Sequence, residues 1–131
     1  LKPGGIIVSA FISRYGVWAD IMNKNPEILD DPAGAQMLLD EGQDPFFTEW
    51  GRVFKAYFAK VREIAPLHEK VGFRTVVMGG AEPVGITMNE TYAELPDKLR
   101  LKWLDLMLKI SSEPSILGAS AHILYIGKKP A

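Results

Sequence analysis

Residues 1–12 read LKPGGIIVSAFI, and this stretch decides the predicted fold because it joins a turn to a strand. Proline presets the backbone for the first position of a turn, and the glycines accept the positive φ that follows. Residues 5–12 are then almost entirely apolar and rich in β-branched side chains. Such a run is typical of a strand buried on both faces of a sheet, so we expect helices on each side.

Two more apolar strands are predicted farther along the chain, over residues 73–79 and 120–127. Helical segments separate the three strands, and this alternation predicts an α/β fold. A doubly wound sheet usually has about six strands. The chain therefore corresponds to about half of that architecture.

The segment after the first strand predicts two short helices rather than a simple loop. The first spans about residues 15–25 and ends before a proline, since the residue before proline avoids the helical region. The second begins at an Asp31 N-cap with Pro32 in the first turn, and it stops at Gly42. We interpret residues 13–44 as a helical insertion on the substrate side of the sheet.

Further helices are predicted between the later strands. One lies near residues 60–71, provided that Pro66 falls in its first turn, where a missing N–H is tolerated. The sequence TMNE at 87–90 fits a capping box and predicts a short helix, and residues 97–110 predict a longer one. The buried stripe expected for the longer helix consists of Leu99, Trp103, Leu106 and Ile110.

The composition is that of one globular domain of 131 residues, with 47% hydrophobic and 24% charged residues. The 15 Lys and Arg are balanced by 16 Asp and Glu, so the chain lacks the basic excess typical of nucleic-acid binding. No apolar run approaches the length of about 18 residues that spans a bilayer, and no signal peptide opens the chain. These features predict a soluble cytoplasmic protein without nucleic-acid or membrane partners.

Several motifs that carry chemistry are absent from the sequence. There is no G-x-G-x-x-G loop to cradle a cofactor, no P-loop, no H-E-x-x-H pair and no G-x-S-x-G elbow. With no cysteine and 2 histidines, a metal cluster is hard to build. No cofactor-binding or metal-binding residue is therefore assigned.

His122 is the more interesting of the two histidines, because it lies in an apolar strand. A neutral imidazole there can act as a general base if it faces a cleft. The alternative is a partly buried histidine that is hydrogen-bonded to a neighbouring loop, and this reading is the commoner one. Glu82, after the Gly79-Gly80 turn, is interpreted as a solvated loop carboxylate, with a polar site residue as the alternative.

Polar and aromatic side chains follow the first strand, at the edge where ligands bind in open α/β sheets. Arg14 and Tyr15 are candidates to grip an anionic or polar substrate, although a surface arginine beside a helix start is an equal alternative. Trp18 and Tyr57 are candidates to line the substrate pocket. Aromatic residues at helical spacing are more often part of the core.

Three motifs resemble the C-terminal part of class I S-adenosylmethionine-dependent methyltransferases that act on small molecules. LKPGG at residues 1–5 matches the turn before the fifth strand of that family. IAPLHEKVGF at 64–73 is similar to the helix that leads through a Gly-Phe pair into the sixth strand. EPSILGASAHILYIGKK at 113–129 is similar to the family's last strand. The motifs occur in family order across essentially the whole chain.

The resemblance implies the C-terminal half of a Rossmann-like sheet, with strands five, six and seven and the seventh antiparallel between the other two. It implies S-adenosylmethionine as the cofactor and a small-molecule methyl acceptor. In the family, the residues that hold the cofactor precede LKPGG, so we expect the natural start upstream of Leu1 and the chain alone to be inactive. Catalysis would rest mainly on proximity and orientation, with His122 or Tyr15 assisting as a base.

A different class of function also fits the sequence, namely a non-enzymatic α/β module for self-association or protein binding. Half of a doubly wound sheet leaves an edge strand with unpaired backbone groups. Such an edge predicts a homo-oligomer formed through the first strand.

Overall fold

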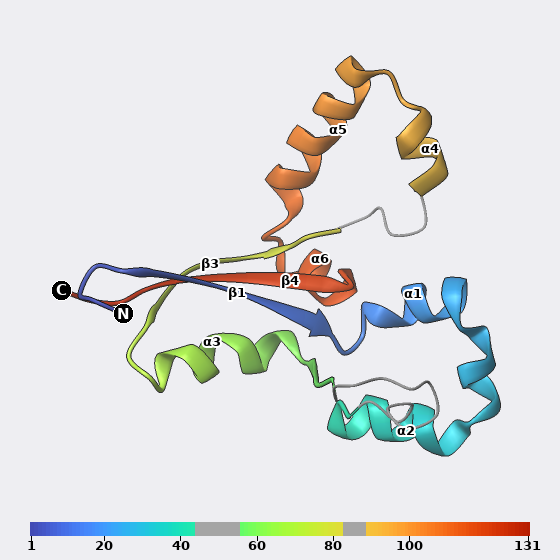
Figure 1. Ribbon diagram of the computed structural model, residues 1–131, viewed down its shortest axis with the longest axis horizontal. Coiled ribbons are helices and arrows are strands. Elements are labelled where there is room, and N and C mark those ends of the chain that lie inside the picture. The colour runs from blue at the N-terminus through green and yellow to red at the C-terminus, as the bar shows by residue number, and fades with distance from the viewer. Residues whose placement is uncertain (44–55, 83–88) are drawn as a thin grey trace.

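The computed structural model describes residues 1–43, 56–82 and 89–131 of the chain (Figure 1). It is an α/β structure, as the alternation of strands and helices predicts. Its elements, in chain order, are β1 (Ile6–Ser13), α1 (Val17–Lys24), the 3-10 helix η1 (Pro26–Asp30), α2 (Pro32–Glu41), β2 (Phe58–Ala59), α3 (Val61–Glu69), β3 (Arg74–Gly80), α4 (Asn89–Glu94), α5 (Asp97–Ile110), α6 (Pro114–Ala119) and β4 (His122–Lys128).

The described strands form one mixed sheet in the order β2-β1-β4-β3. The three strands predicted from the sequence are all present, and β4 runs antiparallel to both β1 and β3 between them. The short strand β2 was not predicted, and it pairs in parallel with the end of β1 at Ile12 and Ser13. Both chain ends lie at the opposite end of the sheet, where the N–H of Gly4 donates to Lys129 O (Figure 1).

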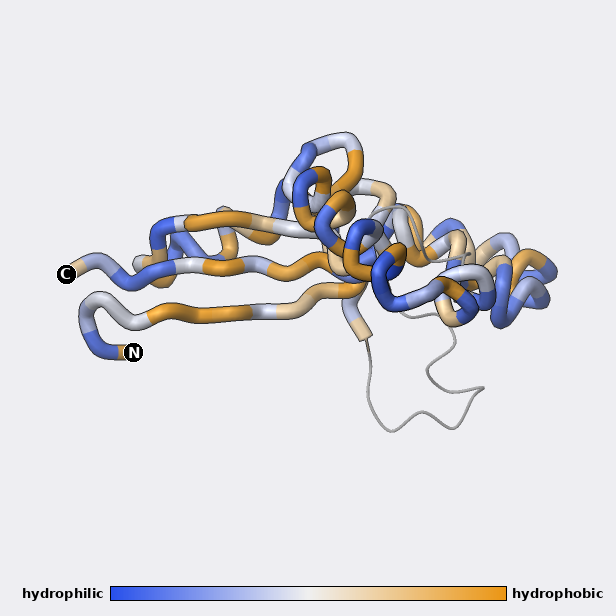
Figure 2. Tube along the Cα trace, turned by 90° about the horizontal axis from the view of Figure 1, so that it is seen from above, coloured by the Kyte–Doolittle hydropathy of each residue, from blue (hydrophilic) through white to orange (hydrophobic). Residues whose placement is uncertain are grey.

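One face of the sheet carries the main core. Helices α3 and α6 pack against this face, where Tyr125 and Ile123 of β4 are fully buried. Figure 2 shows that the strands are hydrophobic along much of their length. The buried members of this cluster are Ala59, Ile64, Leu117, Ile123 and Tyr125.

The opposite face of the sheet is open among the described residues, so the prediction that the first strand is buried on both faces is wrong. Exposed and half-buried residues alternate along most of β1, and Ile6 and Val8 are 62% and 63% exposed. Val8 lies opposite Ile126, and Leu124 and Val77 add further exposed apolar side chains on β4 and β3. The cause is that the helices packed on the sheet cover its other face, while α5 projects away from it (Figure 1).

The two helices predicted after the first strand are confirmed as α1 and α2, with η1 between them. Asp31 caps α2 by accepting a hydrogen bond from the N–H of Gly34 at 2.9 Å, and Pro32 occupies the first turn. Gly42 ends the helix with a φ of 72°. A second core cluster holds this region together and contains Val17, Ile21, Ile28, Leu38 and Phe58.

Helix α3 confirms the helix predicted near residues 60–71, but the condition placed on Pro66 is wrong. Pro66 lies inside the helix rather than in its first turn. It has no N–H to donate to the carbonyl of Arg62, which would be its partner in a regular helix. Both residues are exposed, so water can satisfy that carbonyl. Exposure explains why the helix tolerates the proline.

Both later helices predicted from the sequence are present, but the buried stripe of the longer one is wrong and a further helix was missed. The helix over 97–110 is confirmed as α5, but Met107 is its buried residue, and Leu99 and Leu106 of the predicted stripe are exposed. The stripe fails because α5 projects away from the sheet (Figure 1). Helix α6 was not predicted, although Glu113 caps it and Pro114 opens it. The short helix predicted from residue 87 onward is confirmed as α4, whereas Thr87 and Met88 of its capping box lie outside the described residues.

In the part of the chain that the structure describes, none of the helices combines the length and apolar character needed to cross a bilayer.

Candidate functional site

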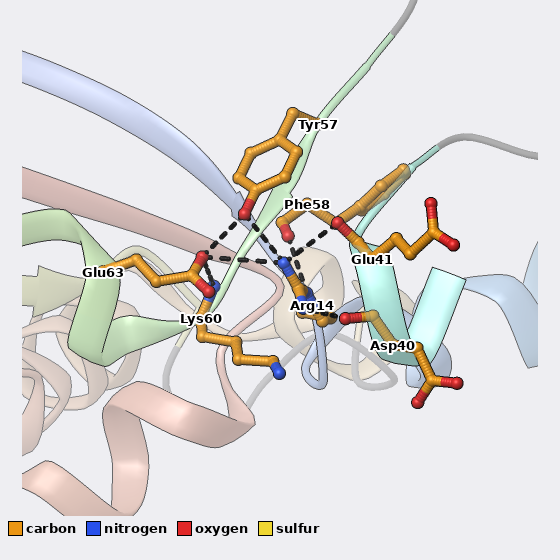
Figure 3. Close-up of polar contacts among 7 residues, drawn as sticks. All are labelled: Arg14, Asp40, Glu41, Tyr57, Phe58, Lys60 and Glu63. Carbon is orange, nitrogen blue, oxygen red and sulfur yellow. Dashed lines mark hydrogen bonds and ion pairs between the residues drawn. The ribbon is translucent and has the colours of Figure 1, made fainter. Parts of the chain in front are cut away.

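Arg14 lies immediately after β1, with its side chain 2% exposed. Its guanidinium group donates hydrogen bonds to three backbone carbonyls: Nε to Phe58 O at 2.9 Å, Nη1 to Asp40 O at 2.9 Å and Nη2 to Glu41 O at 3.3 Å (Figure 3). The two helical carbonyls belong to the last turn of α2, which has no further helical N–H to bind them. Arg14 therefore ties the end of α2 to β2.

Tyr57 and Glu63 complete a group that we name the Arg14 cluster, which consists of these three residues. Arg14 Nη2 donates to the Tyr57 hydroxyl at 2.9 Å, and this hydroxyl donates to Glu63 Oε2 at 2.9 Å (Figure 3). Glu63 Oε2 also lies 3.6 Å from Arg14 Nη2 and accepts the N–H of Lys60 at 3.0 Å. The carboxylate thereby caps α3 and neutralises the buried arginine.

The cluster shifts two pKa values in opposite directions. Burial raises the pKa of Tyr57, and the neighbouring Glu63 carboxylate raises it further, while Arg14 opposes the shift. Burial alone would raise the pKa of Glu63. However, the hydrogen bonds from the Lys60 N–H and Tyr57, together with the charges of Arg14 and Lys60, outweigh burial and lower that pKa. Tyr57 therefore stays a neutral hydrogen-bond donor and Glu63 stays an anion, which is the arrangement that best satisfies Arg14.

Substrate binding by Arg14 and Tyr57 stays a prediction, but the geometry gives both residues another role. Each nitrogen of the guanidinium group already donates to an acceptor within the protein. The ring of Tyr57 remains 55% exposed, while its hydroxyl is held by Arg14 and Glu63. In this arrangement Arg14 organises the edge of the sheet, and Tyr57 offers a ring face rather than a free hydroxyl.

Tyr15 follows Arg14 and lies at a surface cleft of about 260 Å³, which we name the Tyr15 cleft. This cleft lies next to the first turn of α3, beyond the carboxyl end of β1, where open α/β sheets bind ligands. Tyr15 is 52% exposed, so its hydroxyl is available to a ligand. The residues that line the cleft are Tyr15, Lys60, Val61, Arg62, Pro114 and Gly118.

His122 lies at the start of β4, opposite Ile12 of β1. Its ring Nδ1 is 2.9 Å from Glu82 Oε1, and its backbone N–H donates to Glu82 Oε2 at 3.2 Å. A carboxylate bound at Nδ1 favours the tautomer whose Nε2 accepts a proton. Both side chains are partly open to solvent. The pair therefore has the geometry of an oriented general base, and catalysis by His122 stays a prediction.

Trp18 of α1 packs against the cluster of Val17, Ile21 and Phe58 as a half-buried residue. Its indole Nε1 is buried and has no hydrogen-bond partner among the described residues. These surroundings agree with the alternative interpretation, in which Trp18 is an aromatic residue of the core. A pocket role for Trp18 stays a prediction.

The second histidine forms an enclosed pair with Ser9. His68 Nδ1 lies 2.8 Å from the carbonyl of Ile64, which can only accept, so Nδ1 carries the proton and Nε2 accepts from Ser9 Oγ at 3.0 Å. The ring stacks on Tyr125 with the ring centroids 3.8 Å apart. His68 is a buried residue of α3 and is 6% exposed. This serine–histidine pair therefore supports the core, because a substrate has no access to it.

The structure thus brings Arg14 and Tyr57 into direct contact, while Tyr15, Trp18 and His122 take part in separate contacts. Sequence reasoning missed the partners Glu63, Lys60 and Arg62, and it interpreted Glu82 as a solvated carboxylate. Glu63 was detectable, because a glutamate at the third position of a helix often accepts the N-cap N–H. The Glu82–His122 contact joins positions 40 residues apart, and local sequence carries no signal for it.

Within residues 1–43, 56–82 and 89–131, no group of three or more His, Cys, Asp or Glu side chains is placed to hold a metal ion.

Comparison of the chain with protein-family models and with curated protein sequences gives no match.

Proposed function

We propose that the chain forms the substrate side of a Rossmann-like S-adenosylmethionine-dependent methyltransferase that acts on a small molecule. The observation that carries this proposal is the strand order β1-β4-β3 with β4 antiparallel to both neighbours. Strands five, seven and six of that family follow the same order and directions. Two of the motifs behind the resemblance also precede strands, as they do in the family. Gly4 and Gly5 lie before β1, and Gly72 and Phe73 lie before β3.

The described residues do not fit the cofactor itself. The Tyr15 cleft carries the cationic side chains of Lys60 and Arg62, which would repel a sulfonium group. It also lacks a carboxylate among its lining residues to hold ribose hydroxyls. The sequence contains no G-x-G-x-x-G loop. Residues other than the described ones would have to supply the cofactor site, and we assign no cofactor contact to the described residues.

The part of the reaction that we assign to the chain is the handling of the acceptor. His122 Nε2 would take the proton of an acidic acceptor group, while Glu82 holds Nδ1–H and stabilises the imidazolium that forms. Tyr15 would orient the acceptor from the Tyr15 cleft. An acceptor that needs no deprotonation would depend on orientation alone.

Cofactor binding and methyl transfer test this proposal. Calorimetric titration of the 131-residue chain with S-adenosylmethionine should show no tight binding, because the described residues do not fit the cofactor. The product of the complete reading frame that encodes this chain should bind S-adenosylmethionine and transfer its labelled methyl group to a small-molecule extract. The same protein carrying His122→Gln should retain cofactor binding and lose much of the transfer. A complete product that binds no S-adenosylmethionine would contradict the proposal.

Self-association is the second candidate function, and the open face of the sheet favours it. Ile6, Val8, Val77 and Leu124 form an exposed apolar surface on adjacent strands. The edge of β1 is paired with β2 only at Ile12 and Ser13 among the described residues. Light scattering should then show a concentration-dependent oligomer that the double substitution Ile6→Lys and Val8→Lys dissociates. A monomer at high concentration would exclude this candidate.

A further inference from the structure

We infer that the Tyr15 cleft binds an anionic group, a carboxylate or a phosphate, of the small-molecule substrate. The inference rests on the proposed function only in assigning the anion to the methyl acceptor.

Two of the residues that line the cleft, Lys60 and Arg62, are cationic, while most of the lining surface is apolar. Lys60 is the N-cap of α3 and Arg62 lies in its first turn, and both residues line the same cleft as Tyr15. In the part of the chain that the structure describes, the Arg62 side chain makes no hydrogen bond or ion pair. Figure 3 shows the Lys60 side chain directed away from the Arg14 cluster, with its ammonium group unpaired among the residues drawn.

The nearby carboxylates are already committed to other donors. Glu63 accepts from Tyr57 and from the Lys60 N–H, and it forms the ion pair with Arg14. Glu113, which precedes Pro114, accepts from both the N–H and the hydroxyl of Ser115. Neither carboxylate lines the cleft. The Lys60 charge acts on Glu63 without forming an ion pair with it, and Arg62 has no ion pair among the described residues, so both cations can still contact a ligand.

The backbone adds to this preference. Val61 and Arg62 occupy the first two positions of α3, where N–H groups have no carbonyl acceptor within the helix. The positive end of the helix dipole lies at the same place. An anion in the cleft would meet two cations, a phenol and free amides together. This combination distinguishes the cleft from isolated surface lysines.

Titration of the isotope-labelled chain with inorganic phosphate and with acetate, at constant ionic strength in chloride, tests the inference. We expect saturable amide shifts at Tyr15, Val61, Arg62 and Gly118. Lys60→Gln and Arg62→Gln should each weaken the binding about threefold to fivefold, the scale of an exposed ion pair. The anion that binds more tightly indicates whether the substrate carries a phosphate or a carboxylate.

A second cationic cleft offers a matched control. This cleft, of about 340 Å³, is lined by Arg74, Lys128 and Lys129 among other residues at the opposite end of the sheet. Arg74→Gln removes the same charge and should leave the shifts at Tyr15 unchanged. Shifts that do not saturate, or that Arg74→Gln reduces as much as Arg62→Gln does, would overturn the inference.

The anion titration and the methyl-transfer assay can fail separately. Saturable anion binding, combined with a complete reading-frame product that binds no S-adenosylmethionine, would refute the methyltransferase and leave the anion site standing. Methyl transfer that Lys60→Gln and Arg62→Gln leave unchanged, together with no anion binding, would refute the anion site alone.

Discussion

Glu82 holds His122 by two hydrogen bonds, from ring Nδ1 at 2.9 Å and from the backbone N–H at 3.2 Å. The backbone bond fixes the carboxylate at the start of β4, and the ring bond then fixes the imidazole. A neutral imidazole bound in this way donates from Nδ1 and leaves Nε2 as its acceptor. This orientation is what a general base requires.

Glu82→Ala should change the tautomer of His122. With Glu82 present, the neutral ring should carry its proton on Nδ1, because the carboxylate can only accept. Without it, the ring should shift toward the Nε2–H form that free histidine prefers. Ring-nitrogen chemical shifts measured by NMR report the change. His68, whose Nδ1 donates to Ile64 O, is the internal control and should not change. A tautomer unaffected by Glu82→Ala would refute the orienting role.

Arg14→Lys should destabilise the fold by about 3 kcal/mol, because it leaves several carbonyl acceptors without their charged donor. A lysine cannot reach the three carbonyls and Tyr57 together, because it lacks the planar fork of arginine. Urea unfolding measures the loss. Arg62→Lys makes the same change on the surface and should shift the free energy of unfolding by less than about 0.5 kcal/mol. Equal effects of the two substitutions would show that Arg14 is not an anchor.

The lowered pKa of Glu63 predicts a loss of stability in acid. The ordinary value is 4.5, and the folded state holds the carboxyl below it. The stabilisation from Glu63 is therefore complete above the unfolded pKa, and it is lost as the pH falls through the folded pKa. The difference in unfolding free energy between the natural chain and Glu63→Gln should be constant near neutral pH and shrink below about pH 4.5. Tyr57→Phe removes one hydrogen bond to the carboxylate, so it should raise the folded pKa of Glu63 toward the ordinary value and reduce the stability that is lost in acid. A difference that stays constant in acid would contradict the shift.

The sequence predicted the fold better than it predicted the site, and particular residues explain why. The three main strands and α1, α2, α3 and α5 follow from periodicity, caps and turns, which are local signals such as Asp31. The prediction that β1 is buried on both faces was wrong, because an apolar sequence shows which side chains favour burial but not which elements cover them. The Arg14 cluster joins positions 14, 57 and 63 through long-range contacts. The sequence indicated Arg14 and Tyr57 as candidate site residues, but their contact with each other depends on tertiary packing.

Gly42 is constrained both by its positive φ and by the atoms packed against it, and a matched control at Gly4 separates the two constraints. Gly42 and Gly4 both have positive φ, of 72° and 79°, where an added side chain is strained at about 1 kcal/mol. A Cβ at Gly4 would meet open space, whereas one at Gly42 would collide with the Phe58 carbonyl and the Arg14 guanidinium. Gly4→Ala should therefore cost about 1 kcal/mol of unfolding free energy, and Gly42→Ala several times as much. Gly42→Ala should also raise the pKa of Glu63, since displacing Arg14 removes its nearest cation. Equal costs for the two substitutions would mean that the close approach of α2 to Arg14 does not exist in solution.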